Sequence, residues 1–316
     1  MKKTYQYFVI FLFHFFAVYE SRGQVQPYLP EIVTQFPNVR DIAISPDGQE
    51  IYFTAQSLLG EISAIISVKK EKTQWSKPEV ASFSGQYQDL EPAFSPDGLQ
   101  LFFVSNRPLN ESSKTPKDHD IWVLERKDKQ SAWSAPRNLG APVNTFDNEF
   151  YPSVADSKNL YFTSDCAKSK GKDDIFVSRW SNGKYETPAI VSDSVNTGGY
   201  EFNAFVSPDE SFLLYTCYNK QGGFGSGDLY VSYKTANNSW TAPQNLGEKI
   251  NSPQMDYCPW LDRKSGILYF TSKRTEVKTN FDKPQTVKDL QQEMNRYENG
   301  QSRLYWVNLE EVMQKK

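Results

Sequence analysis

The 316-residue sequence is poor in histidine and cysteine, and this scarcity argues against several kinds of site. Of two histidines, His14 falls in an N-terminal apolar run, which leaves His119 alone in the rest of the chain. Zinc catalysis usually takes two or three imidazoles, and a Ser-His-Asp triad would have to be built around His119. The three cysteines, Cys166, Cys217 and Cys258, show no paired spacing, so we expect buried thiols rather than disulfides or a zinc module.

Excess charge of one sign is also missing. The sequence has 35 basic and 38 acidic residues, a net charge of -3, which offers no general field for nucleic acid or anionic lipid. No stretch beyond Gln24 is apolar enough to span a bilayer, so we predict no membrane span in the mature chain. Aromatic residues, in contrast, are plentiful at 18 Tyr, 21 Phe and 7 Trp, as suits half-buried strands.

The N-terminus is typical of a secretory signal. A basic start precedes the apolar run Tyr7–Val18, and small residues stand just before Gln24. We therefore predict a cleaved signal peptide over residues 1–23 and a single domain over residues 24–316, in the periplasm or secreted. The alternative is a signal anchor that is retained.

A repeated β-hairpin organises the rest of the chain. Asp89–Arg107 contains a short strand that ends at Phe94, the turn Ser95–Gly98, and a second strand, Leu101–Ser105. Proline fixes φ at the second position of such a turn, and glycine takes the positive φ that the reversal requires. Four further copies follow the same pattern: Ile42–Phe53, Pro152–Phe162, Ala204–Tyr215 and Pro259–Phe270.

Each repeat also has third and fourth strand signals, and the copies recur at steps of roughly 50 residues. Asp120–Leu124 exemplifies the third strand and Trp133–Leu139 the fourth, where proline suits an edge position. Four antiparallel strands at this period predict an all-β propeller of five blades. The last copy lacks its fourth strand at the C-terminus, and Leu29–Val33 reads like the missing strand, so we expect it to close the ring. A six-bladed ring is the alternative.

These motifs resemble a known family. The Ser-Pro-Asp-Gly hairpin, the third strand and the Trp-Ser-x-Pro segment resemble the WD-like repeat of TolB-type bacterial propellers, and more closely exported propellers of the Bacteroidetes type. The blade links Val143–Thr145, Val195–Thr197 and Ile250–Ser252 and the glycine-rich Gly222–Asp228 loop carry the closer resemblance. Blade one departs from the pattern, with Ala64 in place of the third-strand Asp. The resemblance implies binding and scaffolding in the periplasm or envelope, with no shared chemistry.

One constellation of acids recurs with the repeat. Six residues before the Ser-Pro-Asp position, four blades carry a carboxylate: Asp89, Glu149, Glu201 and Asp256. Blade one has Val39 there, with Asp41 two residues later. Because first strands line a propeller's channel, these acids could approach one another, hold calcium, bind a basic group or act as a glycosidase pair. Alternatively, they bond neighbouring backbone or pair with Arg107 and Arg274.

Residues 275–301 interrupt the last repeat. Thr286 and Asp289 predict a helix start, and an apolar stripe of Val287, Leu290, Met294 and Tyr297 should pack on the propeller rim or, alternatively, dock a partner.

We therefore expect a non-enzymatic, monomeric scaffold that binds an envelope protein or glycan. We expect no nucleic-acid partner and no cofactor, with calcium as the alternative to none. The alternative function is a glycan-active enzyme with carboxylates in the central channel.

Overall fold

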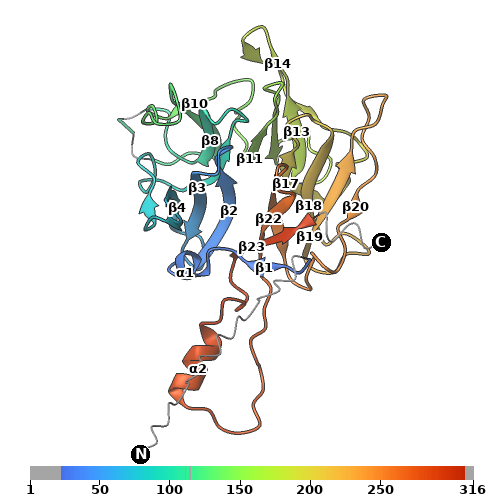
Figure 1. Ribbon diagram of the computed structural model, residues 1–316. Helices are drawn as coiled ribbons and strands as arrows, with labels where there is room; N and C mark the ends of the chain where they lie inside the picture. The colour runs from blue at the N-terminus through green and yellow to red at the C-terminus, as the bar shows by residue number, and fades with distance from the viewer. Residues whose placement is uncertain (1–22, 111, 114, 310–316) are drawn as a thin grey trace, which may run out of the picture.

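Five antiparallel sheets stand as blades around a common axis in the computed structural model, which describes residues 23–110, 112–113 and 115–309 (Figure 1). The chain is therefore an all-β propeller of five blades, as predicted, and not the six-bladed alternative. The predicted signal peptide lies outside the described residues except for Gly23. None of the described helices is long and apolar enough to cross a membrane.

Successive blades repeat one strand order from the axis outward. Blade one comprises β2 (Asn38–Ile44), β3 (Glu50–Gln56), β4 (Ser63–Glu71), β5 (Gln74–Trp75) and β6 (Glu79–Val80). Blade two comprises β7 (Asp89–Phe94), β8 (Gln100–Ser105), β9 (Asp120–Glu125) and β10 (Arg137–Asn138). Blade three comprises β11 (Glu149–Val154), β12 (Leu160–Ser164), β13 (Asp174–Ser178), the small hairpin β14 (Trp180–Ser181) and β15 (Lys184–Tyr185), and β16 (Ala189–Ile190).

Blade four comprises β17 (Tyr200–Val206), β18 (Phe212–Tyr218), β19 (Gly227–Tyr233) and β20 (Gln244–Asn245). Blade five comprises β21 (Asp256–Asp262), β22 (Ile267–Ser272), β23 (Arg303–Asn308) and the N-terminal β1 (Gln26–Pro27). Apolar side chains from adjacent blades form the cores between them: Tyr52 and Ile65 of blade one, for example, cluster with Leu101 and Phe103 of blade two.

The predicted hairpin turns are confirmed. Ser95 Oγ donates to Asp97 Oδ1 at 2.6 Å, and the Gly98 amide donates to the Ser95 carbonyl at 2.8 Å, with Gly98 at a φ of 74°. Asp97 also accepts from the Leu99 amide at 2.9 Å. The side chains of the turn thus satisfy the backbone groups that the reversal leaves unpaired.

The N-terminus closes the ring, but with residues slightly earlier than predicted. Gln26 pairs with Trp306 and Pro27 with Tyr305, so β1 is the outer strand of blade five. Leu29–Val33, which we predicted as this strand, instead forms the short helix α1 (Pro30–Val33), with Leu29 as its N-cap. Pro30 stands in the first turn of α1, where its missing N–H costs nothing, whereas it could not donate to a strand ladder.

The outer strands of blades one to four begin after the Trp-Ser-x-Pro motif from which we predicted them. In blades one to four the ladder strand follows the proline of the Trp-Ser-x-Pro motif or its variants, as in β6 after Pro78 and β20 after Pro243. Trp75 and Tyr185 lie instead in the minor strands β5 and β15. Proline thus ends the connection to the outer strand rather than forming part of that strand.

The predicted helix of the last repeat exists as α2 (Val287–Met294), and Thr286 and Asp289 form its capping box. The expectation that its stripe packs on the rim is wrong for the helix itself. Val287 is 73% exposed and Met294 64% exposed, and α2 stands away from the blades (Figure 1). Only Tyr297, beyond the helix, reaches the propeller, where its hydroxyl bonds the carbonyls of Tyr28 and Leu304.

Candidate functional site

All five innermost strands break their register at the same place, and each break presents one residue in the left-handed region. Five residues, one per blade, share this position with φ between 50° and 57°: Asp41, Glu91, Tyr151, Asn203 and Cys258. The pairing shifts of these strands flank it, for example between Arg40 and Ala43 in blade one. Such β-bulges re-aim a side chain, and here they gather five buried side chains at the axis.

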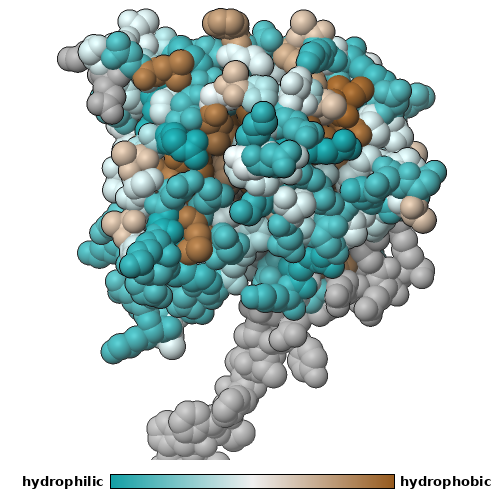
Figure 2. Space-filling view, turned by 90° about the horizontal axis from the view of Figure 1, so that it is seen from above, coloured by the Kyte–Doolittle hydropathy of each residue, from teal (hydrophilic) through white to brown (hydrophobic). Residues whose placement is uncertain are grey.

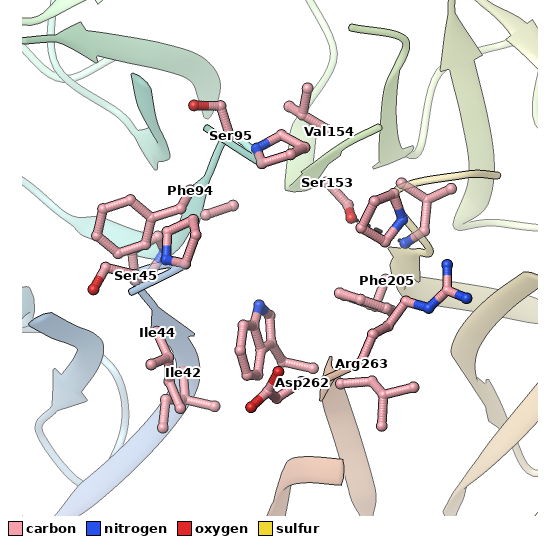
Figure 3. Close-up of a pocket in the computed structure, with 18 of the residues that line it drawn as sticks. Ile42, Ile44, Ser45, Phe94, Ser95, Ser153, Val154, Phe205, Asp262 and Arg263 are labelled. Carbon is pink, nitrogen blue, oxygen red and sulfur yellow. Dashed lines mark hydrogen bonds between the residues drawn. The ribbon is translucent and has the colours of Figure 1, made fainter. Parts of the chain in front are cut away.

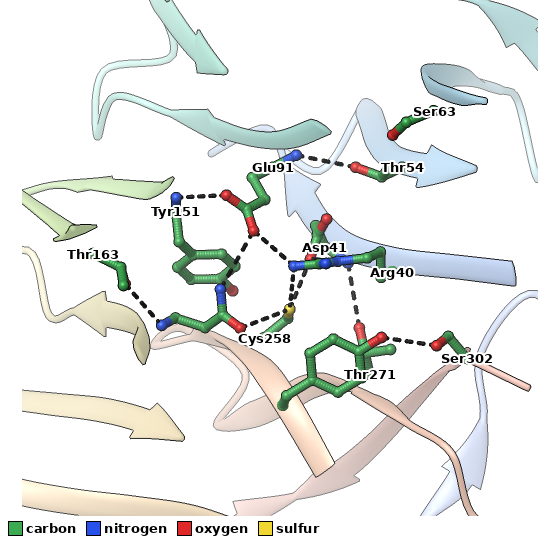
Figure 4. A network of polar contacts seen from close by, with 12 residues as sticks. Arg40, Asp41, Thr54, Ser63, Glu91, Tyr151, Thr163, Cys258, Thr271 and Ser302 are labelled. Atoms are coloured by element: carbon green, nitrogen blue, oxygen red, sulfur yellow. Dashed lines mark hydrogen bonds and ion pairs between the residues drawn. The ribbon is translucent and has the colours of Figure 1, made fainter. Parts of the chain in front are cut away.

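Arg40 is the centre of the resulting polar network (Figure 4). Its guanidinium donates to Asp41 Oδ1 at 2.7 Å and to Glu91 Oε1 at 2.6 Å. Cys258 Sγ donates to the same Asp41 oxygen at 2.7 Å. Asn203 Nδ2 lies 3.4 Å from Glu91 Oε1, so these side-chain contacts join blades one, two, four and five in one connected cluster. The Arg40 side chain therefore supplies the positive charge that a bound cation would otherwise bring to these two carboxylates.

Backbone groups of the bulges are held by the adjacent blade. The amides of Asp41, Glu91 and Asn203 donate to the hydroxyls of Thr271, Thr54 and Thr163, respectively. Blade two has Val104 at the threonine position, and there Glu91 Oε2 accepts from the Tyr151 amide at 2.6 Å instead. Glu91 thus replaces a missing hydroxyl and joins blade two to blade three.

Burial governs the charge states in this network. It raises the pKa of Glu91 to about 7, a shift that Arg40 opposes and the charge of Asp41 reinforces. Burial and the Asp41 carboxylate also raise the pKa of the Cys258 thiol well above its usual value, so this thiol is a neutral hydrogen-bond donor and not a thiolate nucleophile.

Above the network, a cavity of about 470 Å³ occupies the axis on the face of the hairpin turns (Figure 3). Glu91 and Tyr151 contribute to its lining, so the polar network forms its floor. All five first strands contribute apolar walls, made by Ile42, Ile44, Phe94, Val154, Phe205 and Trp260. Figure 2 looks onto this face, where hydrophobic side chains lie between hydrophilic ones. We call this space the axial cavity.

The four acids predicted from the repeat occupy the other end of the first strands, each within its own blade junction. Glu149 accepts from the amide and hydroxyl of Thr145, and Glu201 from those of Thr197, at 2.6 to 3.1 Å. Asp256 bonds Ser252 in the same way. These residues therefore tie the first strand to the turn that links it to the preceding blade.

Asp89 and Asp256 also have cationic partners. Arg107 lies 2.7 Å from Asp89, and Arg274 lies 3.0 Å from Asp256. Lys220 lies 3.9 Å from Glu201. Among the described side chains, no group of three or more His, Cys, Asp and Glu could hold a metal ion. The observed contacts are those of the structural alternative, whereas ligand or calcium binding by the four acids stays a prediction.

His119, in the connection between β8 and β9, is half-buried. Its ring lies 5.3 Å from that of Phe150, and burial lowers the pKa of the imidazole. It is therefore a packing residue of blade two that lies against the first strand of blade three.

Sequence reasoning did not single out the residues at the axis. They stand two positions after the repeated acid, where the blades carry Asp, Glu, Tyr, Asn and Cys. The sequence does contain a sign of this site, because the residue at this position differs in every blade of a repeat that is otherwise regular. From the sequence, Asp41 stands out only as an acid two residues after Val39, and Cys258 only as an expected buried thiol.

No family model matches the sequence, and no curated protein does. Among solved structures, a glycoside hydrolase is similar with 8% identity and a TM-score of 0.55, over 85% of this chain and 86% of that protein. An alpha-L-arabinofuranosidase from Lactobacillus brevis has 13% identity and a TM-score of 0.47, over 84% of this chain and 89% of that protein. A putative TolB from Agrobacterium tumefaciens has 13% identity and a TM-score of 0.47, over 79% of this chain and 76% of that protein. At these identities the likeness shows the propeller fold alone.

Proposed function

We propose that this protein is a non-enzymatic, exported propeller that binds a protein or glycan partner at the bacterial cell envelope through the axial cavity. The observation that carries the proposal is the cavity itself, with apolar walls from all five blades and a floor of buried polar groups. Cavities of this size with apolar walls and few polar groups are the usual form of a binding site.

The contacts of Glu91 favour binding over catalysis. A carboxyl with a pKa of about 7 could in principle serve as a general acid. Both oxygens of Glu91 are already engaged, however, Oε1 by Arg40 and Asn203 and Oε2 by the Tyr151 amide. Glu91 therefore holds blades together, and a glycosidase would need a carboxyl directed at the sugar.

The walls indicate which part of a partner enters. Trp260, Phe205 and Phe94 offer aromatic surface, and burying such surface with an apolar group is favourable by about 25 cal/mol per Å². Charged residues such as Asp47 and Lys264 also line the cavity and would meet the polar surroundings of that group. An apolar side chain on a protein surface fits this arrangement best.

The proposed place of action rests on the sequence. The predicted signal peptide and the resemblance to exported TolB-type propellers support a periplasmic or secreted location, and we propose a monomer without a cofactor.

The test is capture of a partner from envelope extract with the mature protein as bait. Ile44→Glu places a charge in the cavity wall, and Val80→Glu places the same charge on the 55%-exposed edge of blade one as a control. We expect a partner that wild type and Val80→Glu retain and that Ile44→Glu loses, with both variants folded. Equal capture by all three proteins would refute the role of the cavity.

The enzymatic alternative makes a different prediction. Hydrolysis of a glycan by the wild-type protein, lost in Glu91→Gln while the melting temperature is kept, would replace our proposal with a glycosidase.

A further inference from the structure

A second recess lies between blades two and three, apart from the axial cavity. It has a volume of about 360 Å³ and is lined by residues of β9 and β10 on one side and of the β14–β15 hairpin on the other. We call it the interblade groove. None of its lining residues lines the axial cavity.

Trp180 distinguishes this groove from the equivalent place in other blades. Six residues after the Asp that begins the third strand, or Ala64 in blade one, blades one, two and four carry a basic residue: Lys70, Arg126 and Lys234, respectively. Blade three carries Trp180 at this position. The indole is 36% exposed, and the ring of Tyr185 meets it edge-on at 4.8 Å. Tyr185 thus holds an aromatic platform that lines the groove.

Planar polar groups face this platform from blade two. Glu125 Oε1 accepts from Gln100 Nε2 at 2.9 Å and from Arg137 at 3.4 Å, so these three side chains hold one another in place. Carboxylate, amide and guanidinium groups can each form paired hydrogen bonds with adjacent hydroxyls of a ligand.

The charge of the groove is positive. Its charged lining residues are Arg137, Lys158 and Lys184 against a single acid, Glu125, which Arg137 already neutralises. Lys158 and Lys184 are exposed, and Lys158 Nζ lies 5.9 Å from the centre of the Trp180 ring. Lys158 Nζ lies over this ring, so a negative group on a ligand that contacts Trp180 would meet the lysine at the ring face.

We propose that the interblade groove binds an acidic saccharide, a short chain of sugars that carry carboxylates. A sugar ring has an apolar C–H face for the indole, hydroxyls for the Gln100–Glu125–Arg137 group, and, in a uronic acid, a carboxylate for the lysines. An apolar peptide would leave the polar group unused, and a neutral sugar would leave the lysines unused.

The experiment is calorimetric titration of the full mature protein with a short oligomer of galacturonic acid. A galactose oligomer of the same length and a polyglutamate peptide of the same charge are the comparison ligands. We expect binding of the acidic sugar alone, weakened at high salt because the pairing is ionic. Trp180→Ala should weaken it about tenfold through the lost stacking surface. Lys184→Gln should weaken it less and reduce the salt dependence.

Tyr233→Ala is the matched control, since it removes a 40%-exposed aromatic ring from blade four. It should bind like wild type. The proposal is overturned if wild type does not bind the acidic oligomer, if the galactose oligomer or polyglutamate binds equally well, or if folded Trp180→Ala keeps full affinity. Because the groove is separate from the axial cavity, these results leave the Ile44→Glu test independent.

Discussion

Arg40 determines whether the axial network is stable, because it faces two buried carboxylates. Replacement by Met leaves Asp41 and Glu91 without their cation, and breaking a buried pair from one side costs about 3 to 5 kcal/mol. We expect Arg40→Met to lose this much free energy of unfolding in denaturant titrations. The control is Arg137→Met, whose exposed ion pair with Glu125 should contribute about 0 to 1 kcal/mol. Equal stability of the two variants would contradict the network.

Glu149 should make stability depend on pH. Burial raises its pKa from an ordinary 4.5 to about 7, so between these values the folded state binds more protons than the unfolded state. Stability therefore falls as pH rises through this range, at about 1.4 kcal/mol per unit of pKa shift at most. We expect the melting temperature to fall between pH 5 and pH 8, roughly the ends of this window, and Glu149→Gln to flatten the fall. A Glu149→Gln profile parallel to wild type would argue against this assignment.

The repeated acids provide a calcium test. Glu149 and Glu201 each accept two hydrogen bonds from a linker threonine, and loss of such buried bonds costs about 1 to 3 kcal/mol each. We expect the double variant Glu149→Gln, Glu201→Gln to melt lower than wild type, and calcium to leave wild type unchanged. A large calcium shift in wild type that the double variant abolishes would instead make these acids a metal site.

The two-residue strand β1 completes blade five and thereby closes the ring of blades. It covers the outer edge of β23, and the ring of Tyr28 next to it meets Tyr269 edge-on at 4.8 Å. Removal of residues 24–28 should expose that edge and open the ring. We expect earlier thermal unfolding or aggregation, whereas removal of Gln24 alone should have little effect. Unchanged melting of the longer truncation would show that β1 is dispensable.

The hairpins could be predicted from sequence because their cause is local. Ser95, Asp97 and Gly98 bond one another within the turn, and blade one repeats the same residue types with Ser45, Asp47 and Gly48. The Leu29–Val33 segment was mispredicted because a strand-like sequence was overruled by Pro30 and by the competing pairing of Gln26 and Pro27. The exposed stripe of α2 could not be predicted, since periodicity shows that a helix has an apolar face but not what covers it.

The glycine-rich loop shows the same limit. The Gly222–Asp228 loop carries part of the family resemblance, and the structure shows how the loop is held. The amides of Phe224 and Gly225 donate to the Asp228 carboxylate near the start of β19. A side chain at Gly225 would lie 1.8 Å from the Gln254 carbonyl of the next blade link. The bonds to Asp228 are local, whereas the approach of Gly225 to Gln254 joins residues that local sequence patterns cannot place side by side.

At the scale of the whole molecule, the two ends of the first strands have different tasks. At one end the acids that sequence identified bond the blade links, and at the other the varied bulge residues and the walls above them surround the axial cavity. The repeat thus predicted the fold and the acids of the blade junctions, whereas the candidate binding site lies where the repeat departs from itself.

The most direct test of the axial cavity is photo-crosslinking in envelope preparations. A photoreactive phenylalanine at Phe94, which lines the cavity, is compared with the same residue at Tyr233, which is exposed on blade four. We predict one discrete adduct from position 94 that Ile44→Glu suppresses, and none of that size from position 233. The absence of a specific adduct at position 94, or the same adduct from both positions, would contradict a binding role for the cavity.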